Sequence, residues 1–455
     1  MHKIGFGEKL GHGAFSVSCN LVIQFVVTFV LFFYTDVFGI PPAAGGLILA
    51  VGMIWDGLTD PVVANFSDNR RFKNGERIRP LIKYVCAPLT IVLIFMFTPI
   101  PLSPVLSIVY CLVLYLMYDT LTTLLRLPSF ALPILATNDQ PTRLSLNTYI
   151  SGGATLGAVL ASVLCWPLVR LFSGLDADGN LVNPQIGFPL TAAVISAIVV
   201  GGSLWCYFTS KERIRPKEED EEKLSLMRSF KIAASNHNFR WNAAFSTLYF
   251  VNNALLSTTL VYYVIYVLHD GGLVTLVMGI FALGSIVALP VIKKIDRRLG
   301  RRKAMMLGAI LIISSNIPFV IFPFSVVTMI IKAFVMGLSV TLNIVTFSVT
   351  RAEVADHIEY VHNRRIDNMV VNFQGLVNKC GTALTVLGIG LVLQFTGYQA
   401  HLSVQPQSVT TGLIAIMGWT PIVLSTVMLF CASKITIEDV LARMNAEAET
   451  EEQHA

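Results

Sequence analysis

Charged residues are scarce in this chain of 455 residues. Asp, Glu, Lys and Arg together make up 13% of it, whereas ordinary soluble domains contain about 25%. Hydrophobic residues make up 54%, and the mean hydropathy is +0.67. This composition is not that of a soluble globular domain. It predicts an all-α integral membrane protein that crosses the bilayer many times.

Several functional signals are also missing. The seven cysteines are scattered through apolar segments, without the spacing of a metal site or a disulfide framework. No G-x-x-x-x-G-K loop occurs, which argues against a role for ATP. No short apolar stretch with a small-residue cleavage site follows residues 1–9, so we expect the first span to remain in the mature protein. The net charge of +5 comes from short loops between spans and predicts no nucleic-acid partner.

Long apolar runs are what the chain does contain. A helix needs about 20 apolar residues to cross a membrane. Twelve stretches of the sequence meet this condition, at residues 15–38, 43–66, 80–100, 105–134, 146–172, 188–209, 242–268, 272–293, 304–323, 326–350, 368–396 and 410–432.

Lys and Arg are nearly absent from every second link between these spans. The links after spans two, four, six, eight and ten carry them, whereas the links after spans one, three, five, seven, nine and eleven contain essentially none. Cytoplasmic loops carry the excess of positive charge in membrane proteins. The alternation therefore predicts a multi-pass protein of the cytoplasmic (inner) membrane with both termini in the cytoplasm.

The chain divides into two halves of six spans. The longest hydrophilic stretch, residues 211–240, contains the acidic run Glu218-Glu219-Asp220-Glu221-Glu222 and is interpreted as a cytoplasmic linker. The prediction is an N-terminal half at residues 1–210, a C-terminal half at 241–433 and a cytoplasmic tail at 434–455.

Two acidic residues lie inside the second apolar span. Asp56 and Asp60 are four positions apart in Ile54-Trp55-Asp56-Gly57-Leu58-Thr59-Asp60-Pro61, so they share one helix face. A charge within the bilayer costs several kcal/mol or more unless it is paired or hydrated, which makes such acids functional candidates. The pair favours a cation or proton site. The alternative is that both acids lie at a helix end, in water or in structural salt bridges.

The links after spans two and eight repeat one pattern. Asp68-Asn69-Arg70-Arg71 is followed by Gly75-Glu76-Arg77, and Asp296-Arg297-Arg298-Leu299-Gly300-Arg301 stands at the matching place in the second half. An acid followed by bases and a Gly-Arg pair resembles the loop signature of the major facilitator superfamily, whose two halves are parallel repeats. We interpret these charges as a cytoplasmic gate, or alternatively as topological charge alone. The candidate gate residues are Asp68, Arg77, Asp296, Arg297 and Arg301.

A longer series of segments narrows the resemblance. The chain resembles the glycoside–pentoside–hexuronide:cation symporter family, which includes the melibiose carriers. The segments that carry this resemblance are Tyr34-Thr35-Asp36-Val37-Phe38-Gly39, Trp55-Asp56 through Asp60-Pro61, Gly75-Glu76-Arg77-Ile78-Arg79-Pro80, Leu127-Pro128, Arg143-Leu144-Ser145-Leu146-Asn147-Thr148-Tyr149, Ala355-Asp356-His357-Ile358-Glu359-Tyr360 and Lys379.

The resemblance implies secondary active sugar transport driven by Na⁺, H⁺ or Li⁺. It implies that Asp56 and Asp60 bind the cation, as Na⁺ ligands if the carrier is sodium-coupled. Thr59 stands where the melibiose carriers have an asparagine of the cation site, and Thr123 matches a hydroxyl near it. Lys379 matches the family's membrane lysine in span eleven, with snorkelling as the alternative.

The chain departs from the melibiose carriers in the implied sugar site. The acid of span four is replaced by Arg126, the acid of span one by Asn20 and the arginine of span five by Ser151. Met53 replaces an arginine beside the acids of span two. Phe130 keeps an aromatic ring where the family has tryptophan.

Arg126 has two open interpretations. Its planar guanidinium matches a carboxylate bidentately, so it could bind an anionic substrate group such as that of a hexuronate or hexuronide. It could instead be a counter-ion of Asp56, Asp60 or Asp119.

Together these features predict a carrier with the major facilitator fold and not an enzyme. It imports a sugar or sugar acid in symport with H⁺ or Na⁺ by alternating access, without a cofactor, and acts as a monomer. The alternatives are a non-transporting membrane sensor on the same fold, or an exporter or lipid-type carrier. The phenylalanines of the first span (Phe25, Phe29, Phe32 and Phe33) are expected to face lipid.

Overall fold

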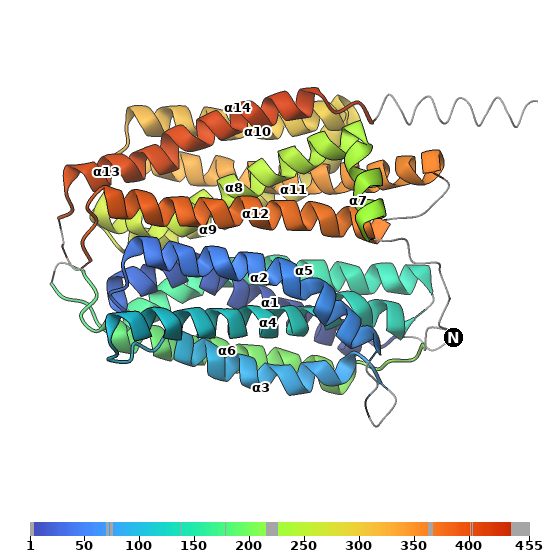
Figure 1. Ribbon diagram of the computed structural model, residues 1–455, viewed down its shortest axis with the longest axis horizontal. Helices are drawn as coiled ribbons and strands as arrows, with labels where there is room; N and C mark the ends of the chain where they lie inside the picture. The colour runs from blue at the N-terminus through green and yellow to red at the C-terminus, as the bar shows by residue number, and fades with distance from the viewer. Residues whose placement is uncertain are drawn as a thin grey trace, which may run out of the picture. The chain divides into compact units, whose positions relative to one another are not determined.

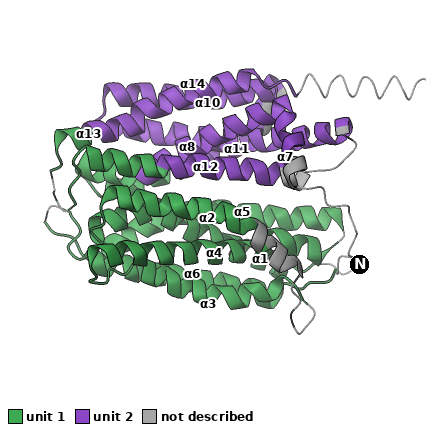
Figure 2. Cartoon of the chain, in the orientation of Figure 1, with its two compact units in different colours: residues 1–219, 260–279, 386–410 green, residues 220–259, 280–385, 411–455 purple. Residues whose placement is uncertain are grey.

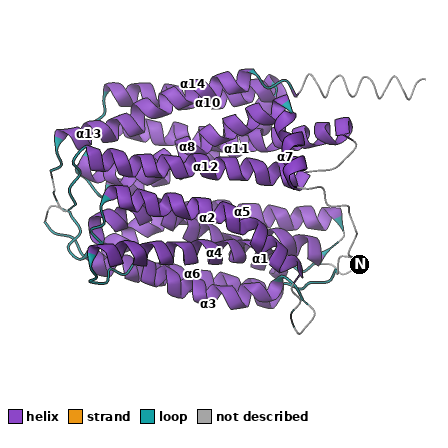
Figure 3. Ribbon diagram, in the orientation of Figure 1, coloured by secondary structure: helices purple, strands orange, loops and turns teal. Residues whose placement is uncertain are grey.

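A computed structural model of the chain describes residues 4–69, 72, 76–137, 139–177, 179–214, 226–362, 367–400, 402 and 404–437 (Figure 1). Within the helices, this description leaves out the side chains of residues 61–62, 64–69, 226–229, 293, 296–297, 362 and 367–369. In the described ranges every regular element is a helix, and the one extended contact is an isolated bridge between Leu175 and Leu181 (Figure 3).

Twelve helices are long and apolar enough to cross a membrane, which confirms the predicted number of spans. The predicted boundaries differ at several places. The first span begins at Phe6, nine residues earlier than expected, because the helix continues through polar residues beyond its apolar run. The last span is interrupted by a π-helical turn, which divides it into three elements.

The first compact unit comprises residues 1–219, 260–279 and 386–410, coloured green in Figure 2. It therefore contains the first six spans together with short segments from the second half of the sequence. Its complete elements are α1 (Phe6–Phe32), η1 (Phe33–Val37), α2 (Pro42–Asn69), α3 (Arg79–Met96), α4 (Pro104–Ala136), α5 (Gln140–Ser173) and α6 (Pro184–Thr209).

The second unit comprises residues 220–259, 280–385 and 411–455, coloured purple in Figure 2. Four of its helices also contribute residues to the first unit, namely α8 (His237–Tyr266), α9 (Leu273–Leu299), α12 (Asp367–Phe395) and α13 (Gln407–Ile414). Its other elements are α7 (Leu226–Ser235), α10 (Arg301–Ile321), α11 (Val326–His362), η2 (Ala415–Trp419) and α14 (Thr420–Ser433).

An aromatic core fills the first unit around α1. Phe25, Phe29, Phe32 and Phe33 are all at most 4% exposed, so the expectation that they face lipid was wrong. Phe29 stacks on Trp166 of α5, with ring centroids 5.7 Å apart. Apolar periodicity could not separate a lipid-facing stripe from a helix that neighbours surround, because both are apolar.

Small residues allow α1 and α5 to approach closely. A Cβ on Gly153 would overlap the backbone of Gly13, and a Cβ on Gly157 would overlap that of Val17. Close approach through small residues is the usual way in which membrane helices pack. This contact fixes α5 against α1 in the unit that contains the candidate site.

Candidate functional site

Helices α2 and α4 pack side by side through three successive contacts. A Cβ on Gly52 would overlap the ring of Tyr115, so glycine lets the helices approach there. The indole nitrogen of Trp55 donates a hydrogen bond of 2.9 Å to the Thr120 hydroxyl. One residue further along α2, the carboxylate of Asp56 faces α4.

The hydroxyl of Thr123 donates a hydrogen bond of 2.9 Å to Oδ1 of Asp56. Two residues on different helices are thereby brought together, and both come from the set implied for the cation site. The Thr59 hydroxyl donates to the backbone carbonyl of Asp56 at 3.3 Å. Asp56 is half-buried, whereas Asp60, one turn further along α2, is exposed. The carboxylate and hydroxyl oxygens gathered here are the ligand type that hard cations prefer.

Arg126 lies three residues after Thr123 on α4 and is exposed. Its guanidinium carbon is 6.0 Å from the centroid of the Phe130 ring on the same helix. It forms no ion pair with any residue that the structure describes.

The other candidate substrate residues are distributed over three helices. Asn20 follows Cys19 on α1, is half-buried and donates to the carbonyl of Ser16 at 2.9 Å. Ser151 is exposed on α5. Lys379 is half-buried on α12 in the second unit, next to Asn378, whose side-chain oxygen accepts hydrogen bonds from Ser246 and Thr247, both at 2.9 Å.

One carboxylate caps the start of α3, near the candidate gate residue Arg77. Glu212 accepts hydrogen bonds from three successive backbone N–H groups, those of Arg77 at 2.9 Å, Ile78 at 2.8 Å and Arg79 at 2.6 Å. A negative charge is favourable at a helix N-terminus because the first amides have no partner within the helix. Glu212 thereby fastens the segment after α6 to the first unit.

The next residue strengthens this attachment. Both terminal nitrogens of the Arg213 guanidinium donate to the Glu8 carboxylate of α1, at 2.7 and 2.8 Å. The hydrogen bond that Arg213 donates to Glu8, together with the negative charge of Glu8, raises the pKa of Arg213 above its usual value. The backbone N–H groups of Arg213 and Ile214 both donate to the carbonyl of Leu135 at 2.9 Å. We call residues 211–214 the linker clamp, because they join α1, α3 and α4.

In the second unit, the candidate gate residue Arg301 forms an ion pair with Glu353 of α11. Glu353 was not among the candidate gate residues, and it lies far from the loop in the sequence. The side chains of the other gate candidates, Asp68, Asp296 and Arg297, lie outside the part of the chain that the structure describes.

A second polar cluster surrounds Asp36, a residue that the sequence analysis quoted only as part of a motif. The hydroxyls of Tyr266 and Tyr398 both donate to Oδ1 of this carboxylate. Thr35 donates to Oδ2 at 2.6 Å, and its hydroxyl lies 2.7 Å from that of Tyr262. We call these five residues the Asp36 cluster. Burial, and then the charge of Asp36, raise the pKa of Tyr398, so its phenol remains a donor.

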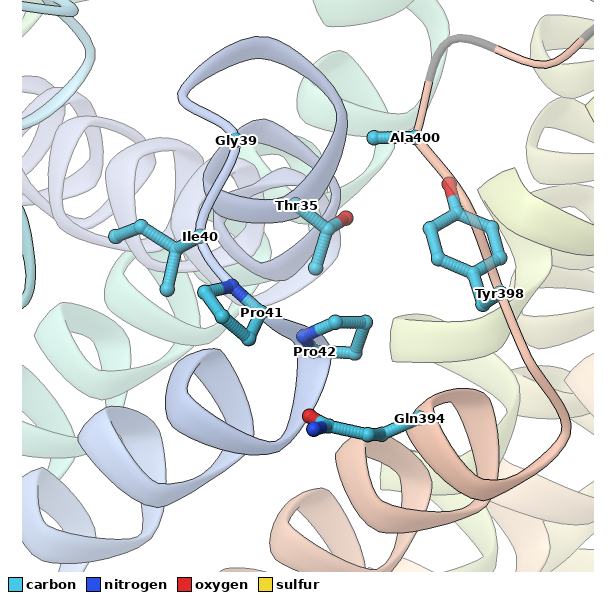
Figure 4. Close-up of a pocket in the computed structure, with 8 residues that line it drawn as sticks. All are labelled: Thr35, Gly39, Ile40, Pro41, Pro42, Gln394, Tyr398 and Ala400. Atoms are coloured by element: carbon cyan, nitrogen blue, oxygen red, sulfur yellow. The ribbon is translucent and has the colours of Figure 1, made fainter. Parts of the chain in front are cut away.

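The Asp36 cluster lies wholly in the first unit but joins η1, which continues α1, to segments from the second half of the sequence. Figure 4 shows the neighbouring cavity, of about 360 Å³, where Thr35 and Tyr398 lie near the Pro41-Pro42 start of α2. The side chain of Gln394 lies below them and accepts a hydrogen bond of 3.1 Å from the backbone N–H of Ala43. The i, i+4 spacing of Tyr262 and Tyr266 was visible in the sequence, but their contacts with Thr35 and Asp36 were not.

Lys332 is a further charged residue that the sequence analysis missed. It is 1% exposed in α11, it donates to the carbonyl of Met417 in the π-helical turn η2, and it lies 3.7 Å from the centroid of the Phe319 ring. A lysine inside an apolar span is a detectable signal, because charges there are rare. All three residues belong to the second unit.

Comparison with known proteins agrees with this architecture. The family model described as MFS/sugar transport protein matches residues 11–439. The uncharacterized symporter YnaJ of Bacillus subtilis (strain 168) is 28% identical and covers 91% of this chain and 89% of its own length. The isoprimeverose transporter of Lactiplantibacillus pentosus is 25% identical, with 93% of this chain and 87% of that protein covered.

A solved structure shows the same fold. The crystal structure of the nucleoside transporter NupG matches with a TM-score of 0.67 over 93% of this chain and 98% of its own, at 15% identity. The family model spans nearly the whole chain, and its matched range includes all the candidate cation and substrate residues. The chain therefore belongs to the MFS/sugar transport protein family and is a membrane transporter of the melibiose-carrier-like symporter group.

Proposed function

We propose that this protein imports a sugar or sugar acid together with H⁺ or Na⁺ by alternating access, as a monomer of the cytoplasmic membrane with both termini in the cytoplasm. The single observation that carries the proposal is the Asp56–Thr123 hydrogen bond, with Asp60 one turn away and Arg126 one turn along α4. This contact supports a coupling-ion site between α2 and α4 and a substrate-binding arginine on α4, within one unit.

The coupling ion binds between α2 and α4. Two nearby carboxylates repel each other, and a bound cation or proton relieves that repulsion. Asp56 supplies one carboxylate, the neighbouring Thr123 oxygen has lone pairs for an ion, and the exposed Asp60 supplies the second charge. This arrangement can bind either a proton or Na⁺ as the coupling ion.

The substrate interacts with Arg126. An arginine without a carboxylate partner among the described residues can donate several hydrogen bonds to a ligand, and it matches an anionic group best. The Phe130 ring beside it offers an apolar surface to a sugar ring. We therefore propose hexuronates or hexuronides as preferred substrates, with Asn20 and Ser151 as further members of the site in the first unit. On the family resemblance alone, we also propose that Lys379 of the second unit binds substrate.

Transport assays test the coupling. We expect uptake of a radiolabelled sugar panel into vesicles to depend on Na⁺ or on the proton gradient. Asp56→Asn and Asp60→Asn should abolish accumulation against a gradient while expression and membrane insertion persist. Asp176→Asn, a carboxylate in the 174–183 loop, is the matched control and should accumulate normally. Full accumulation by either span-two variant would refute the cation-site assignment.

A second assay tests the substrate class. In competition for uptake, glucuronate should exceed methyl β-D-galactoside in the wild type. Arg126→Gln should lose this preference, and Arg126→Lys, which keeps the charge but not the planar fork, should retain part of it. If neutral glycosides compete better in the wild type and Arg126→Gln leaves the ranking unchanged, the anionic-substrate proposal is wrong.

A further inference from the structure

A cavity of about 560 Å³ lies in the first unit, away from the site on α2 and α4. It is formed by the ends of α1 and α5, the loop at residues 174–183, the turn at 267–272 and the segment after α12. The loops among these segments are links that carry essentially no Lys or Arg, and the helix ends adjoin such links. A volume of this size is within the range of small-molecule sites, about 300–1,000 Å³.

Arg170 is the charged donor of this cavity. It is half-buried near the end of α5, between two glycines: a Cβ on Gly272 would lie 2.9 Å from its Nη1, and one on Gly179 would lie 4.0 Å from its Nη2. The guanidinium makes no ion pair and no hydrogen bond with the residues that the structure describes. A half-buried donor that lacks a protein partner needs water or a ligand, because an unsatisfied polar group is costly.

Asp270 supplies a hydrogen-bond acceptor that lies close to the same Cβ position of Gly272 as Arg170 does. The Cβ built on Gly272 would also lie 2.9 Å from Oδ1 of Asp270, and that oxygen accepts a hydrogen bond of 2.8 Å from the backbone N–H of Gly272. Arg170 and Asp270 do not form an ion pair. They present a donor and an acceptor separated by a gap that the missing side chain of Gly272 keeps open.

Aromatic residues form the apolar wall. Trp166 is held rigidly, because its indole nitrogen donates a hydrogen bond of 2.5 Å to the carbonyl of Gly271. Phe32 and Tyr266 line the same cavity, and the hydroxyl of Tyr266 is directed to Asp36. Small-molecule sites combine such apolar walls with a few placed polar groups.

We propose that this cavity is a second binding site for a sugar ring, in which a vicinal diol bridges Arg170 and Asp270. One hydroxyl oxygen accepts from the guanidinium and the adjacent hydroxyl donates to the carboxylate, while the ring packs against the aromatic wall. The guanidinium disfavours a metal cation, and the carboxylates of Asp36 and Asp270, which both line the cavity, disfavour an anion. A neutral polyhydroxylated ring therefore fits best. The inference rests on the proposed sugar-transport function and adds a site separate from Arg126.

The test is protection of an introduced cysteine. Val404 lines the cavity and is 74% exposed, so Val404→Cys provides a label position that alters no polar group. Cys380, the exposed native cysteine of the described part of the chain, is replaced by serine. Detergent-solubilised protein is reacted with a maleimide in the presence of methyl β-D-galactoside or methyl β-D-xyloside. A sugar at about ten times its Kd should slow labelling about tenfold.

Matched controls separate this site from the central one. Protection should persist in Asp56→Asn and disappear in Arg170→Gln and Gly272→Ala, the latter filling the gap without changing a charge. Tetrahydropyran-2-methanol, a ring without a vicinal diol, should not protect. The inference is overturned if neither glycoside slows labelling, or if Arg170→Gln is protected as well as the wild type. Protection without any sugar uptake would contradict the proposed transport function but support this second site. Uptake without protection would support the transport function and overturn the second site.

Discussion

At the scale of single residues, the Asp56–Thr123 contact is the centre of the candidate site. It joins two helices through one hydroxyl and one carboxylate, at a distance of 2.9 Å. A hydrogen bond to a charged group contributes about 1.5–3 kcal/mol. Small changes to either partner should therefore have measurable effects on coupling.

We expect Thr123→Val to lower the apparent affinity for the coupling ion about tenfold or more, because about 1.4 kcal/mol corresponds to a factor of ten. Thr123→Ser keeps the hydroxyl and should stay close to the wild type. The measurement is the ion concentration that gives half-maximal uptake. Equal values for the valine and serine variants would remove Thr123 from the cation site.

Lys332 leads to a prediction about stability. Taking a charge out of water costs several kcal/mol, and this ammonium is fully buried with one carbonyl and one aromatic ring as its partners. We expect Lys332→Met, which keeps the apolar stem, to raise the midpoint of thermal denaturation in detergent at a fixed scan rate. Lys434→Met, an exposed lysine near Phe430, is the control and should leave the midpoint unchanged. A clear fall for Lys332→Met would mean that the bond to Met417 outweighs the cost of burial.

The sequence allowed the acids of the second span to be identified, because charge in an apolar run is a signal in itself. It did not reveal their partners beyond Thr123, which the family resemblance supplied. The Asp36 cluster and the Arg301–Glu353 pair join residues far apart in the chain, and no local pattern encodes such pairs. The burial of the Phe-rich face of α1 was predicted wrongly for the same reason, since neighbours decide what surrounds an apolar face.

At the scale of elements, the beginning of α3 depends on a residue that follows α6. Three amides at this helix end share one carboxylate, that of Glu212. The hydrophobic pattern located α3 and α6 as spans, but it contained no information on this cap. The cap also anchors the linker clamp, so its loss should be detectable at a distance from α3.

We expect Glu212→Ala to destabilise the protein by about 1–2 kcal/mol, since charge-assisted caps at helix N-termini contribute on this scale. Residues 211–214 should then be cut faster in limited proteolysis. Lys211→Ala, an exposed neighbour, is the matched control. Unchanged cleavage rates in Glu212→Ala would show that the ion pair of Arg213 alone holds the clamp.

The hydrogen bonds of the Asp36 cluster should couple the local stability of η1, α8 and the segment after α12. Tyr398→Phe and Tyr266→Phe each remove a donor to a buried carboxylate and should speed hydrogen exchange in residues 264–270 and 396–400. Tyr249→Phe, whose hydroxyl makes no hydrogen bond within the described residues, should have no such effect. In an Asp36→Asn background, the two tyrosine substitutions should have smaller effects than in the wild type. Additive effects would contradict a shared network.

At the scale of the whole molecule, the charge pattern of the links predicts orientation. Reporter fusions at both termini should be active in the cytoplasm, and a cysteine at Gly179 should react with an impermeant reagent from the outside. The N-terminal fusion reports the side of the membrane on which the N-terminus lies, and cysteine labelling reports the side of the 174–183 loop. Together they identify the outer end of the protein, to which the second sugar site would open. Labelling of the Gly179 position only from the cytoplasm would reverse the assigned direction of every span.

The composition of the first unit limits how this chain can be recombined. Residues 260–279 and 386–410 belong to it although the linker precedes them. A polypeptide ending at the linker would lack Tyr266 and Tyr398, which donate to Asp36, and Tyr262, which contacts Thr35. The first fragment of a split gene would therefore bury this carboxylate without its two tyrosine donors. Chimeras that exchange halves with a relative would need Tyr262, Tyr266 and Tyr398 to match the incoming α1. Exchange of one half alone would therefore disrupt the Asp36 cluster unless these tyrosines are retained.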